Sequence, residues 1–237
     1  MITLLAPAGS LTPGASVSLE ATEAHHLRVR RGEATEQLRL VDGRGRVGYG
    51  QVTLGSHGAH VTLERVEEAP FPARLVLAVG AGEKDRFGWL AEKATELGVT
   101  DLVPIECDRT ASVASRVREG SIERIQRRAT EALKQCGGTW APKVHANTPL
   151  ARFLEEAPTG RRWVMDQEGA ELPAHLGEEA VTCLIGPEGG FTAEELRACE
   201  GAGFTRVSLG RLLLRFETAG LAAASWVSIA RGRRIDG

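Results

Sequence analysis

The stretch "VTCLIGPEGGFTAEE", residues 181–195, joins a β-branched, apolar run to a helical pattern. Residues 181–185 predict a buried strand, and Thr192 followed three residues later by Glu195 is a capping-box pattern that predicts the start of a helix. Between them stand Gly186, Pro187, Glu188, Gly189 and Gly190. Glycine lets a ligand approach the backbone closely. This segment is therefore either a ligand-binding loop or a plain strand-to-helix turn, and it holds more glycine than a turn requires.

The same alternation of strand and helix extends over the chain from residue 74 onward. Apolar runs predict strands over residues 74–81, 101–107, 143–147, 162–168, 181–186 and 206–210. Helical patterns occupy residues 87–99, 121–136, 150–157, 193–202 and 217–232, with Trp89 expected on a buried stripe and Ser121 as an N-cap. Strands that alternate with helices are typical of an α/β domain with a mostly parallel sheet.

The N-terminal part has a different pattern. Short strand-like runs such as "QLRLVDG" (residues 37–43) and "HVTLERV" (residues 60–66) alternate with turn residues, which predicts a small β-barrel or sandwich. The segment "EEAPFPA", residues 67–73, has two prolines within three residues and interrupts both helix and sheet. We therefore expect two domains, residues 1–70 and residues 71–237.

Composition places the chain among ordinary globular proteins. It has 237 residues, 42% of them hydrophobic, and a net charge of −2, which by itself argues neither for nor against nucleic acid as a partner. Its apolar runs are shorter than a membrane span, and residues 1–7 lack the basic region of a signal peptide. The four cysteines have no CxxC spacing, so reduced thiols in a cytoplasmic protein are expected.

A second unusual loop follows the last predicted strand. Leu212, Leu213 and Leu214 run unbroken and are followed by Arg215 and Glu217. Such a run predicts burial in a core, in an adenine-like pocket or in a subunit interface, and the two adjacent charges would then need partners. A core leucine run beside an Arg–Glu surface pair is the simpler alternative.

Several familiar catalytic motifs are absent. The P-loop pattern GxxxxGK[ST] does not occur, and "GAGEKD" (residues 80–85) lacks the third glycine of a dinucleotide fingerprint. The patterns GxSxG and HExxH are also absent, which weakens the serine-hydrolase and zinc-peptidase hypotheses. A binding loop at the carboxyl ends of parallel strands remains the better-supported site.

The pair "GPEGGFTAEE" and "LGRLLLRFETA" resembles the RsmE family of SPOUT-superfamily methyltransferases, which modify N3 of a uridine in 16S ribosomal RNA. The segments "EKATELGV", "KQCGG" and Trp140-Ala141-Pro142 are also similar to that family, and "EAHHLRVRR" with "VDGRG" is similar to its PUA-like RNA-binding domain. The resemblance implies an α/β, trefoil-knotted domain after a small PUA-like β-barrel. It also implies a homodimer, S-adenosylmethionine as methyl donor without a metal, and the small ribosomal subunit as partner.

The resemblance further implies site residues. The cofactor pocket would be lined by Met165, Leu184, Ile185, Gly186, Gly190, Leu209, Gly210, Leu214, Thr218 and Ala219. RNA contacts are expected from His25, His26, Arg28, Arg30 and Arg211, with Arg211 replacing the family arginine where Leu212 stands. The histidine pair has an alternative role in packing the small barrel.

Transfer of a methyl group to uridine N3 requires in-line placement and loss of a weakly acidic proton. Arg215 is the first candidate for orienting the uracil or stabilising negative charge on it, and Glu188 or Glu217 could assist proton removal. Glu217 could instead form a salt bridge that only positions Arg215. Two other functions remain open, namely methylation of another RNA such as transfer RNA, and a non-catalytic module that binds RNA or ribosomes.

Overall fold

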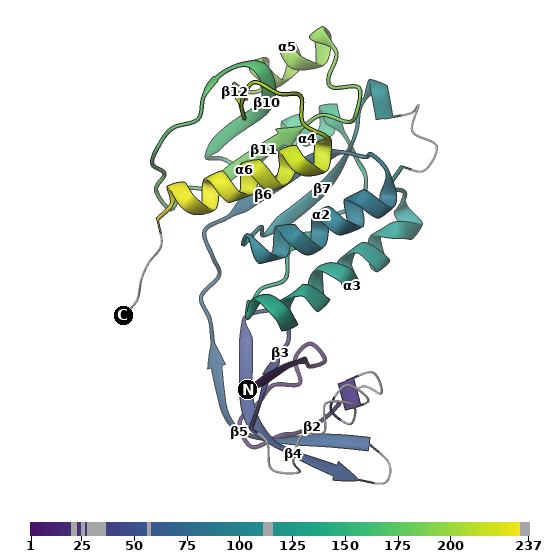
Figure 1. Ribbon diagram of the computed structural model, residues 1–237, viewed down its shortest axis with the longest axis vertical. Coiled ribbons are helices and arrows are strands. Elements are labelled where there is room, and N and C mark those ends of the chain that lie inside the picture. The colour runs from purple at the N-terminus through teal and green to yellow at the C-terminus, as the bar shows by residue number, and fades with distance from the viewer. Residues whose placement is uncertain (20–22, 25–26, 28–36, 56–57, 111–115, 233–237) are drawn as a thin grey trace. The chain divides into compact units, whose positions relative to one another are not determined.

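The computed structural model describes residues 1–237 except 20–22, 25–26, 28–36, 56–57, 111–115 and 233–237 (Figure 1). The chain forms two compact units. One consists of Met1–Phe71 with Glu131–Ala141, and the other of Pro72–Thr130 with Pro142–Gly237. None of the described helices has the length and apolar character needed to cross a membrane.

The first unit is built on a β-sheet. Its described strands are β1 (Ile2–Leu5), β2 (Ser16–Ser18), β3 (Gln37–Val41), β4 (Arg46–Gly55) and β5 (Gly58–Glu68), in the order β1-β3-β4-β5-β2. Strand β1, which the sequence patterns did not predict, pairs parallel with β3, while the other neighbours are antiparallel. Alternate residues such as Leu38, Leu40 and Val61 form the core of this sheet.

Residues 131–141 pack within this first unit. Lys134 Nζ lies 2.7 Å from Glu23 Oε1, and Arg39 donates to the carbonyl oxygen of Gly137. The indole of Trp140 lies against Gly45, where a Cβ atom would come within 2.3 Å of the ring. A glycine is therefore required at position 45, which also has a φ of +92°.

The second unit has the predicted α/β architecture. Its strands are β6 (Leu75–Gly80), β7 (Asp101–Glu106), β8 (Lys143–Val144), β9 (Thr148–Pro149), β10 (Arg161–Glu171), β11 (Val181–Ile185) and β12 (Thr205–Ser208). The order is β12-β10-β11-β6-β7-β8, with β9 beside β7, and every described pairing is parallel. The prediction of a mostly parallel sheet is therefore confirmed.

Helices cover both faces of this sheet. They are α2 (Lys84–Glu96), α3 (Glu119–Cys136), α4 (Leu150–Glu156), α5 (Ala193–Gly201) and α6 (Phe216–Ala230), with a short 3-10 helix η1 (Asp108–Thr110). Leu75, Leu77 and Val79 of β6 belong to the core shared with α2, α3 and α6, whereas Val76 and Ala78 belong to the core shared with α4 and α5. Successive side chains of this one strand thus pack against the helix layers on opposite faces of the sheet.

Two local predictions were wrong. The helix α3 begins at Glu119, so Ser121 lies inside its first turn and is not its N-cap. Trp89 is 41% exposed, because the buried stripe of α2 consists of Phe87, Leu90, Ala91 and Ala94. Helical periodicity predicted both helices correctly, but it misplaced the start of α3 and the buried face of α2.

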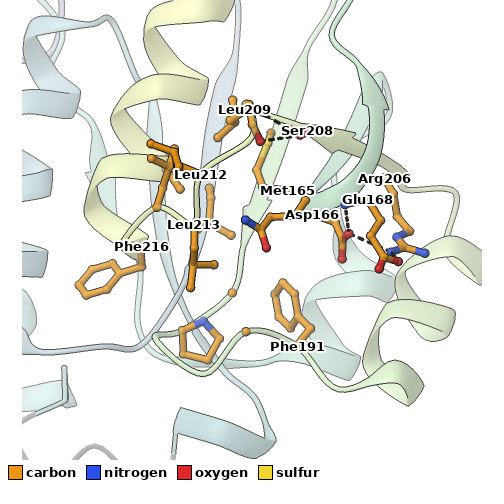
Figure 2. A pocket seen from close by; sticks show the side chains of 18 of the residues that line it. Met165, Asp166, Glu168, Phe191, Arg206, Ser208, Leu209, Leu212, Leu213 and Phe216 are labelled. Carbon is orange, nitrogen blue, oxygen red and sulfur yellow. Dashed lines mark hydrogen bonds and ion pairs between the residues drawn. The ribbon is translucent and has the colours of Figure 1, made fainter.

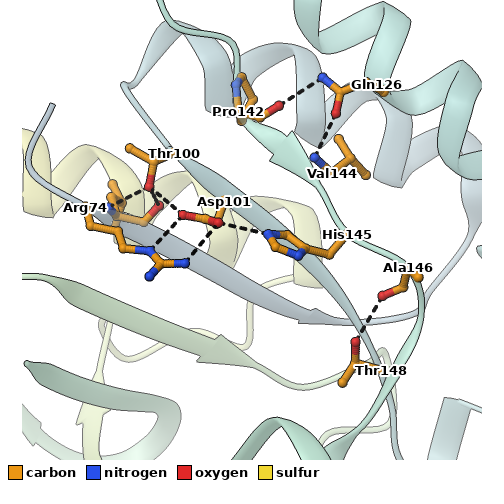
Figure 3. Close-up of polar contacts among 10 residues, drawn as sticks. Arg74, Thr100, Asp101, Gln126, Pro142, Val144, His145, Ala146 and Thr148 are labelled. Atoms are coloured by element: carbon orange, nitrogen blue, oxygen red, sulfur yellow. Dashed lines mark hydrogen bonds and ion pairs between the residues drawn. The ribbon is translucent and has the colours of Figure 1, made fainter. Parts of the chain in front are cut away.

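A hydrogen-bonded network lies where β6 and β7 begin, at the amino edge of the sheet (Figure 3). Arg74 donates to both carboxylate oxygens of Asp101 at 3.0 and 3.2 Å, and Thr100 and His145 contact the same carboxylate at 2.9 and 2.8 Å. Burial by itself raises the pKa of Asp101, but the hydrogen bonds from His145, Arg74 and Thr100 outweigh burial and hold this pKa well below its usual range.

Candidate functional site

A cavity of about 380 Å³ lies at the opposite, carboxyl edge of the sheet (Figure 2). It is bounded by the ends of β10, β11 and β12 and by the start of α6. Its lining consists of Met165, Asp166, Gln167, Glu168, Ile185, Gly186, Pro187, Glu188, Gly190, Phe191, Leu196, Arg206, Ser208, Leu209, Gly210, Leu212, Leu213, Leu214, Phe216 and Ala219. The carboxyl edge is where open parallel sheets bind their ligands.

The glycine-rich loop after β11 forms one wall of the cavity. Gly190 has a φ of +70°, which disfavours other residues, and its N–H donates to the carbonyl oxygen of Pro187 at 2.8 Å. Gly186 lies so close to Gly190 that a Cβ atom there would be 3.1 Å from Gly190 Cα. A Cβ atom on Gly80, at the end of β6, would be 2.4 Å from the nitrogen of Pro187. Tight backbone packing thus accounts for much of the glycine in this loop.

The loop ends at a well-capped helix. The Thr192 side chain accepts from the N–H of Glu195, and the Glu195 carboxylate accepts from the N–H of Thr192 at 2.8 Å. The predicted capping box is therefore present, and it fixes the start of α5. The loop is thereby held between a buried strand at one end and a fixed helix start at the other.

The loop after β12 forms the opposite wall. Gly210 has a φ of +131°, and the Ser208 hydroxyl contacts the backbone of the same turn at 3.2 and 3.3 Å. Leu212 and Leu213 line the cavity but are 79% and 81% exposed. The prediction that these two leucines are buried in the core of the chain is therefore wrong. The other two predicted locations, a ligand pocket and a subunit interface, remain.

Arg206, Asp166 and Glu168 lie on the side of the cavity away from these leucines (Figure 2). Arg206 of β12 donates to Asp166 at 2.8 Å and to Glu168 at 3.3 Å, so two carboxylates share one guanidinium. Glu188 is exposed, and its Oε1 accepts from the N–H of Glu83 at 3.4 Å. The ionisable side chains that line the cavity therefore have more negative than positive charge, which favours a ligand with a positive group.

Most of the predicted pocket residues meet at this cavity. Those that line it are Met165, Ile185, Gly186, Gly190, Leu209, Gly210, Leu214 and Ala219. Leu184 and Thr218 are not in the lining. Successive side chains of a strand point to opposite faces, so Leu184 packs in the core shared with α4 and α5 while Ile185 faces the other way. Thr218 is exposed on α6.

The three predicted catalytic residues are placed differently from one another. Glu188 lines the cavity, whereas Arg215 is exposed at the N-cap of α6. Glu217 is buried and lies 3.6 Å from Arg86 Nη1, so its ion pair is with Arg86 and not with Arg215. Glu217 Oε2 is also buried and has no hydrogen-bond partner within the described chain.

Among the predicted RNA-binding residues, Arg211 is exposed beside the cavity loop, and His25, His26, Arg28 and Arg30 lie outside the described residues. Sequence reasoning missed Glu168, Phe191 and Arg206 as lining residues. Residue 206 is the first residue of the last predicted strand, so the rule that ligands bind at the carboxyl ends of strands gave no signal for it.

The cysteines offer no nucleophile at this site. Burial raises the pKa of Cys107, Cys183 and Cys199 to about 12, so each thiol stays protonated near neutral pH. Within the described residues, no group of His, Cys, Asp and Glu side chains is arranged to hold a metal ion.

Comparison with known proteins connects this geometry to a family. Residues 68–228 match a family model described as an RNA methyltransferase domain. A ribosomal RNA small subunit methyltransferase E from Synechocystis sp. is 31% identical over 226 residues, which cover 90% of this chain and 73% of that protein. The chain therefore belongs to the RNA methyltransferase family.

Solved structures indicate which group of RNA methyltransferases the chain resembles. A ribosomal RNA small subunit methyltransferase E from Neisseria gonorrhoeae, bound to S-adenosyl methionine, superposes with a TM-score of 0.83 at 28% identity and 95% coverage of both chains. A probable rRNA-methyltransferase from Porphyromonas gingivalis superposes with a TM-score of 0.82 at 32% identity, covering 95% of this chain and 96% of that one. Within the RNA methyltransferases, the chain is a member of the RsmE family.

Proposed function

We propose that this protein transfers a methyl group from S-adenosylmethionine to N3 of a uridine in 16S ribosomal RNA, on the assembled small subunit. The observation that carries the proposal is the cavity at the carboxyl edge of the sheet, whose walls are the two loops that resemble the RsmE motifs. The relatives named for methylation of small-subunit ribosomal RNA supply the substrate class.

The lining of the cavity fits S-adenosylmethionine. Apolar side chains such as Leu209 and Leu214 suit a flat aromatic base, and the exposed backbone of the glycine loop supplies polar groups for its edge. Asp166, Glu168 and Glu188 suit the positive sulfonium and ammonium groups. The bound cofactor supplies an activated methyl group, so the protein's part is to hold the two reactants in line.

Residues at the start of α6 and in the glycine loop would bind the uridine and accept its proton. Arg215 is exposed at the N-cap of α6, where its guanidinium is available to orient a uracil and stabilise charge on its oxygens. Glu188 faces the cavity and is placed to accept the N3 proton, directly or through water. Glu217, paired with Arg86, holds the first turn of α6 that presents Arg215.

We also propose that two copies form a homodimer through α6 and the leucine loop. The outward-facing residues of α6 include Trp226, 39% exposed, and Ile229, 73% exposed, and the helix has Glu217 as its single charged residue. Leu212 and Leu213 add further exposed apolar surface. Apolar surface of this kind is typical of a protein interface. Light scattering of the purified protein tests this, with Ile229→Arg expected to yield a monomer.

Further parts of the family architecture belong to the same proposal. Residues 1–70 form a PUA-like domain that binds RNA, and residues 71–237 form a SPOUT domain with a trefoil knot. The antiparallel β3–β4–β5 meander supports the first assignment. The likeness to the RsmE structures over almost the whole chain supports both. Because the proposed substrate is ribosomal, we expect the reaction to take place in the cytoplasm.

A methyl-transfer assay tests the function. The protein and S-adenosylmethionine are mixed with small ribosomal subunits that lack the native modification, and the RNA is digested to nucleosides for mass spectrometry. We expect N3-methyluridine. A different methylated nucleoside, or methylation of transfer RNA alone, would show a SPOUT enzyme with another target. No methylation and no cofactor binding would favour a non-catalytic RNA-binding module.

A further inference from the structure

We propose that Arg109, in the loop after β7, is a positioning residue that holds the glycine-rich cofactor loop in its binding conformation. This inference rests on the proposed function in one respect, that the loop of residues 186–191 binds S-adenosylmethionine. The contacts that carry it join two loops 80 residues apart in the sequence. Neither loop's sequence pattern suggests the connection.

The turn that holds Arg109, residues 107–110, has several hydrogen bonds of its own. It contains the short helix η1, and Thr110 is 3% exposed. The Thr110 hydroxyl donates to the carbonyl oxygen of Cys107 at 2.7 Å and accepts from the N–H of Cys107 at 3.1 Å. The backbone N–H of Thr110 donates to the same carbonyl at 3.0 Å. Arg109 therefore extends from a turn that is closed by hydrogen bonds between Cys107 and Thr110.

Two contacts connect this turn to the cofactor loop. The Arg109 guanidinium donates to the carbonyl oxygen of Gly189. The backbone N–H of Asp108 donates to Glu195 Oε1 at 2.9 Å, and this is the same carboxylate that caps α5. The turn thus contacts the glycine loop in its middle and the helix that follows it at its start.

The Arg109 contact controls one peptide unit of the cavity wall. The Gly189 carbonyl and the Gly190 N–H belong to one planar peptide group. Arg109 holds the carbonyl end, and Pro187 accepts from the N–H end at 2.8 Å. With both ends bonded, this peptide has one orientation, and it sets the position of Gly190 in the cavity lining. A glycine loop without such contacts has many accessible conformations, and binding would have to select one of them.

The contact also explains why residue 189 is a glycine. Gly190 has a positive φ, but Gly189 is not among the glycines with that conformation. A Cβ atom at position 189 would instead lie 3.0 Å from Arg109 Cδ and 3.4 Å from Arg109 Cβ. The side chain of Arg109 therefore passes directly over Gly189, and any larger residue would displace it.

A double-mutant cycle tests this arrangement by calorimetric titration of S-adenosylmethionine without RNA. We expect Arg109→Ala to weaken cofactor binding by about tenfold, because a hydrogen bond from a charged donor is lost. Gly189→Ala should weaken binding in the wild-type background but have little further effect in the Arg109→Ala background, where no side chain crosses residue 189. Arg109→Lys should restore part of the affinity, and turnover at saturating cofactor should change less than KM.

Hydrogen exchange of the ligand-free protein gives a second readout. Amides of residues 186–192 should exchange faster in Arg109→Ala than in wild type, while Arg197→Ala, an exposed arginine on α5, serves as the matched control and should change neither exchange nor affinity. If wild type binds and Arg109→Ala binds equally well with unchanged exchange, Arg109 is not a positioning residue. Additive effects of Arg109→Ala and Gly189→Ala would also overturn the inference. If wild type itself fails to bind S-adenosylmethionine, the proposed function fails, and the exchange data still decide whether Arg109 orders the loop.

Discussion

The amino and carboxyl edges of the parallel sheet differ in their residues and in the hydrogen bonds that their polar groups make. At the amino edge, Asp101 has hydrogen-bond partners on both oxygens, and the Arg231 guanidinium donates to the carbonyl oxygens of Ala73, Arg74 and Glu179. At the carboxyl edge, Leu212 and Leu213 are exposed and line the cavity, and Glu217 Oε2 is buried without a partner in the described chain.

We infer from this difference that the amino edge contributes mainly to stability and the carboxyl edge mainly to ligand binding. Hydrogen-bonded groups such as the Asp101 carboxylate stabilise the amino edge, where the buried Arg231 Nε lacks a partner within the described residues, whereas the carboxyl edge leaves apolar surface for ligands. Substitutions at the amino edge should therefore change the free energy of unfolding with little effect on the cofactor affinity of the folded protein. Substitutions at the carboxyl edge should change the cofactor affinity more than the free energy of unfolding.

The largest contrast is expected from one substitution made at each edge. Gly190 and Gly98 have φ values of +70° and +75°, and Gly98 lies between α2 and β7 at the amino edge. Valine is disfavoured at either position by roughly 1–3 kcal/mol. Gly190→Val should abolish measurable S-adenosylmethionine binding, because the loop must leave its binding conformation. Gly98→Val should lower the melting temperature but keep the affinity, and loss of affinity in both variants would refute the division.

Arg215→Ala should reduce turnover with little change in cofactor affinity. Arg215 is exposed and outside the cavity lining, so its proposed contact is with the uracil. Loss of one group that stabilises the transition state should lower kcat by roughly a hundredfold. Single-turnover kinetics on small subunits measure this, with Arg152→Ala, an exposed residue of α4, as the control. Unchanged turnover would remove Arg215 from the catalytic role.

Asp101→Asn should destabilise the fold by about 2 kcal/mol at pH 7, since hydrogen bonds to a buried charge are weakened. The pKa of Asp101 is lower in the folded than in the unfolded protein, so its stabilising effect is complete above the unfolded value of about 4. That effect is lost as the pH falls below this value. Urea unfolding from pH 7 to pH 3 should therefore show a weaker acid dependence in Asp101→Asn. An equally steep dependence in both proteins would show that other carboxylates cause it.

The smallest effect is expected from Glu188→Gln. S-adenosylmethionine carries a sulfonium charge that the demethylated product lacks, and Glu188 adds negative charge to the cavity. Because Glu188 is exposed, its contribution is at most about 1 kcal/mol. The preference for cofactor over product, from parallel titrations, should fall by roughly threefold. A preference equal to that of wild type would assign Glu188 no electrostatic part in cofactor choice.

The sequence predicts the elements of the second unit because their periodicity is local. Strand β11, the capping box at Thr192 and the alternation of strand with helix all follow from short patterns. The ends and faces of elements depend on tertiary contacts, which is why Ser121 and Trp89 were misplaced. The site loops were identified by composition and resemblance. The contact of Arg109 with Gly189 is beyond any local pattern, since it joins distant loops.

Hydrogen exchange with and without S-adenosylmethionine tests the division between the two edges most directly. Amides of residues 184–191 and 209–219 should be protected by the cofactor, and amides of residues 99–103 and 143–147 should be unchanged. Protection centred on the amino edge, or none at the carboxyl-edge loops despite demonstrated binding, would contradict the placement of the cofactor site in the cavity between β10, β11 and β12.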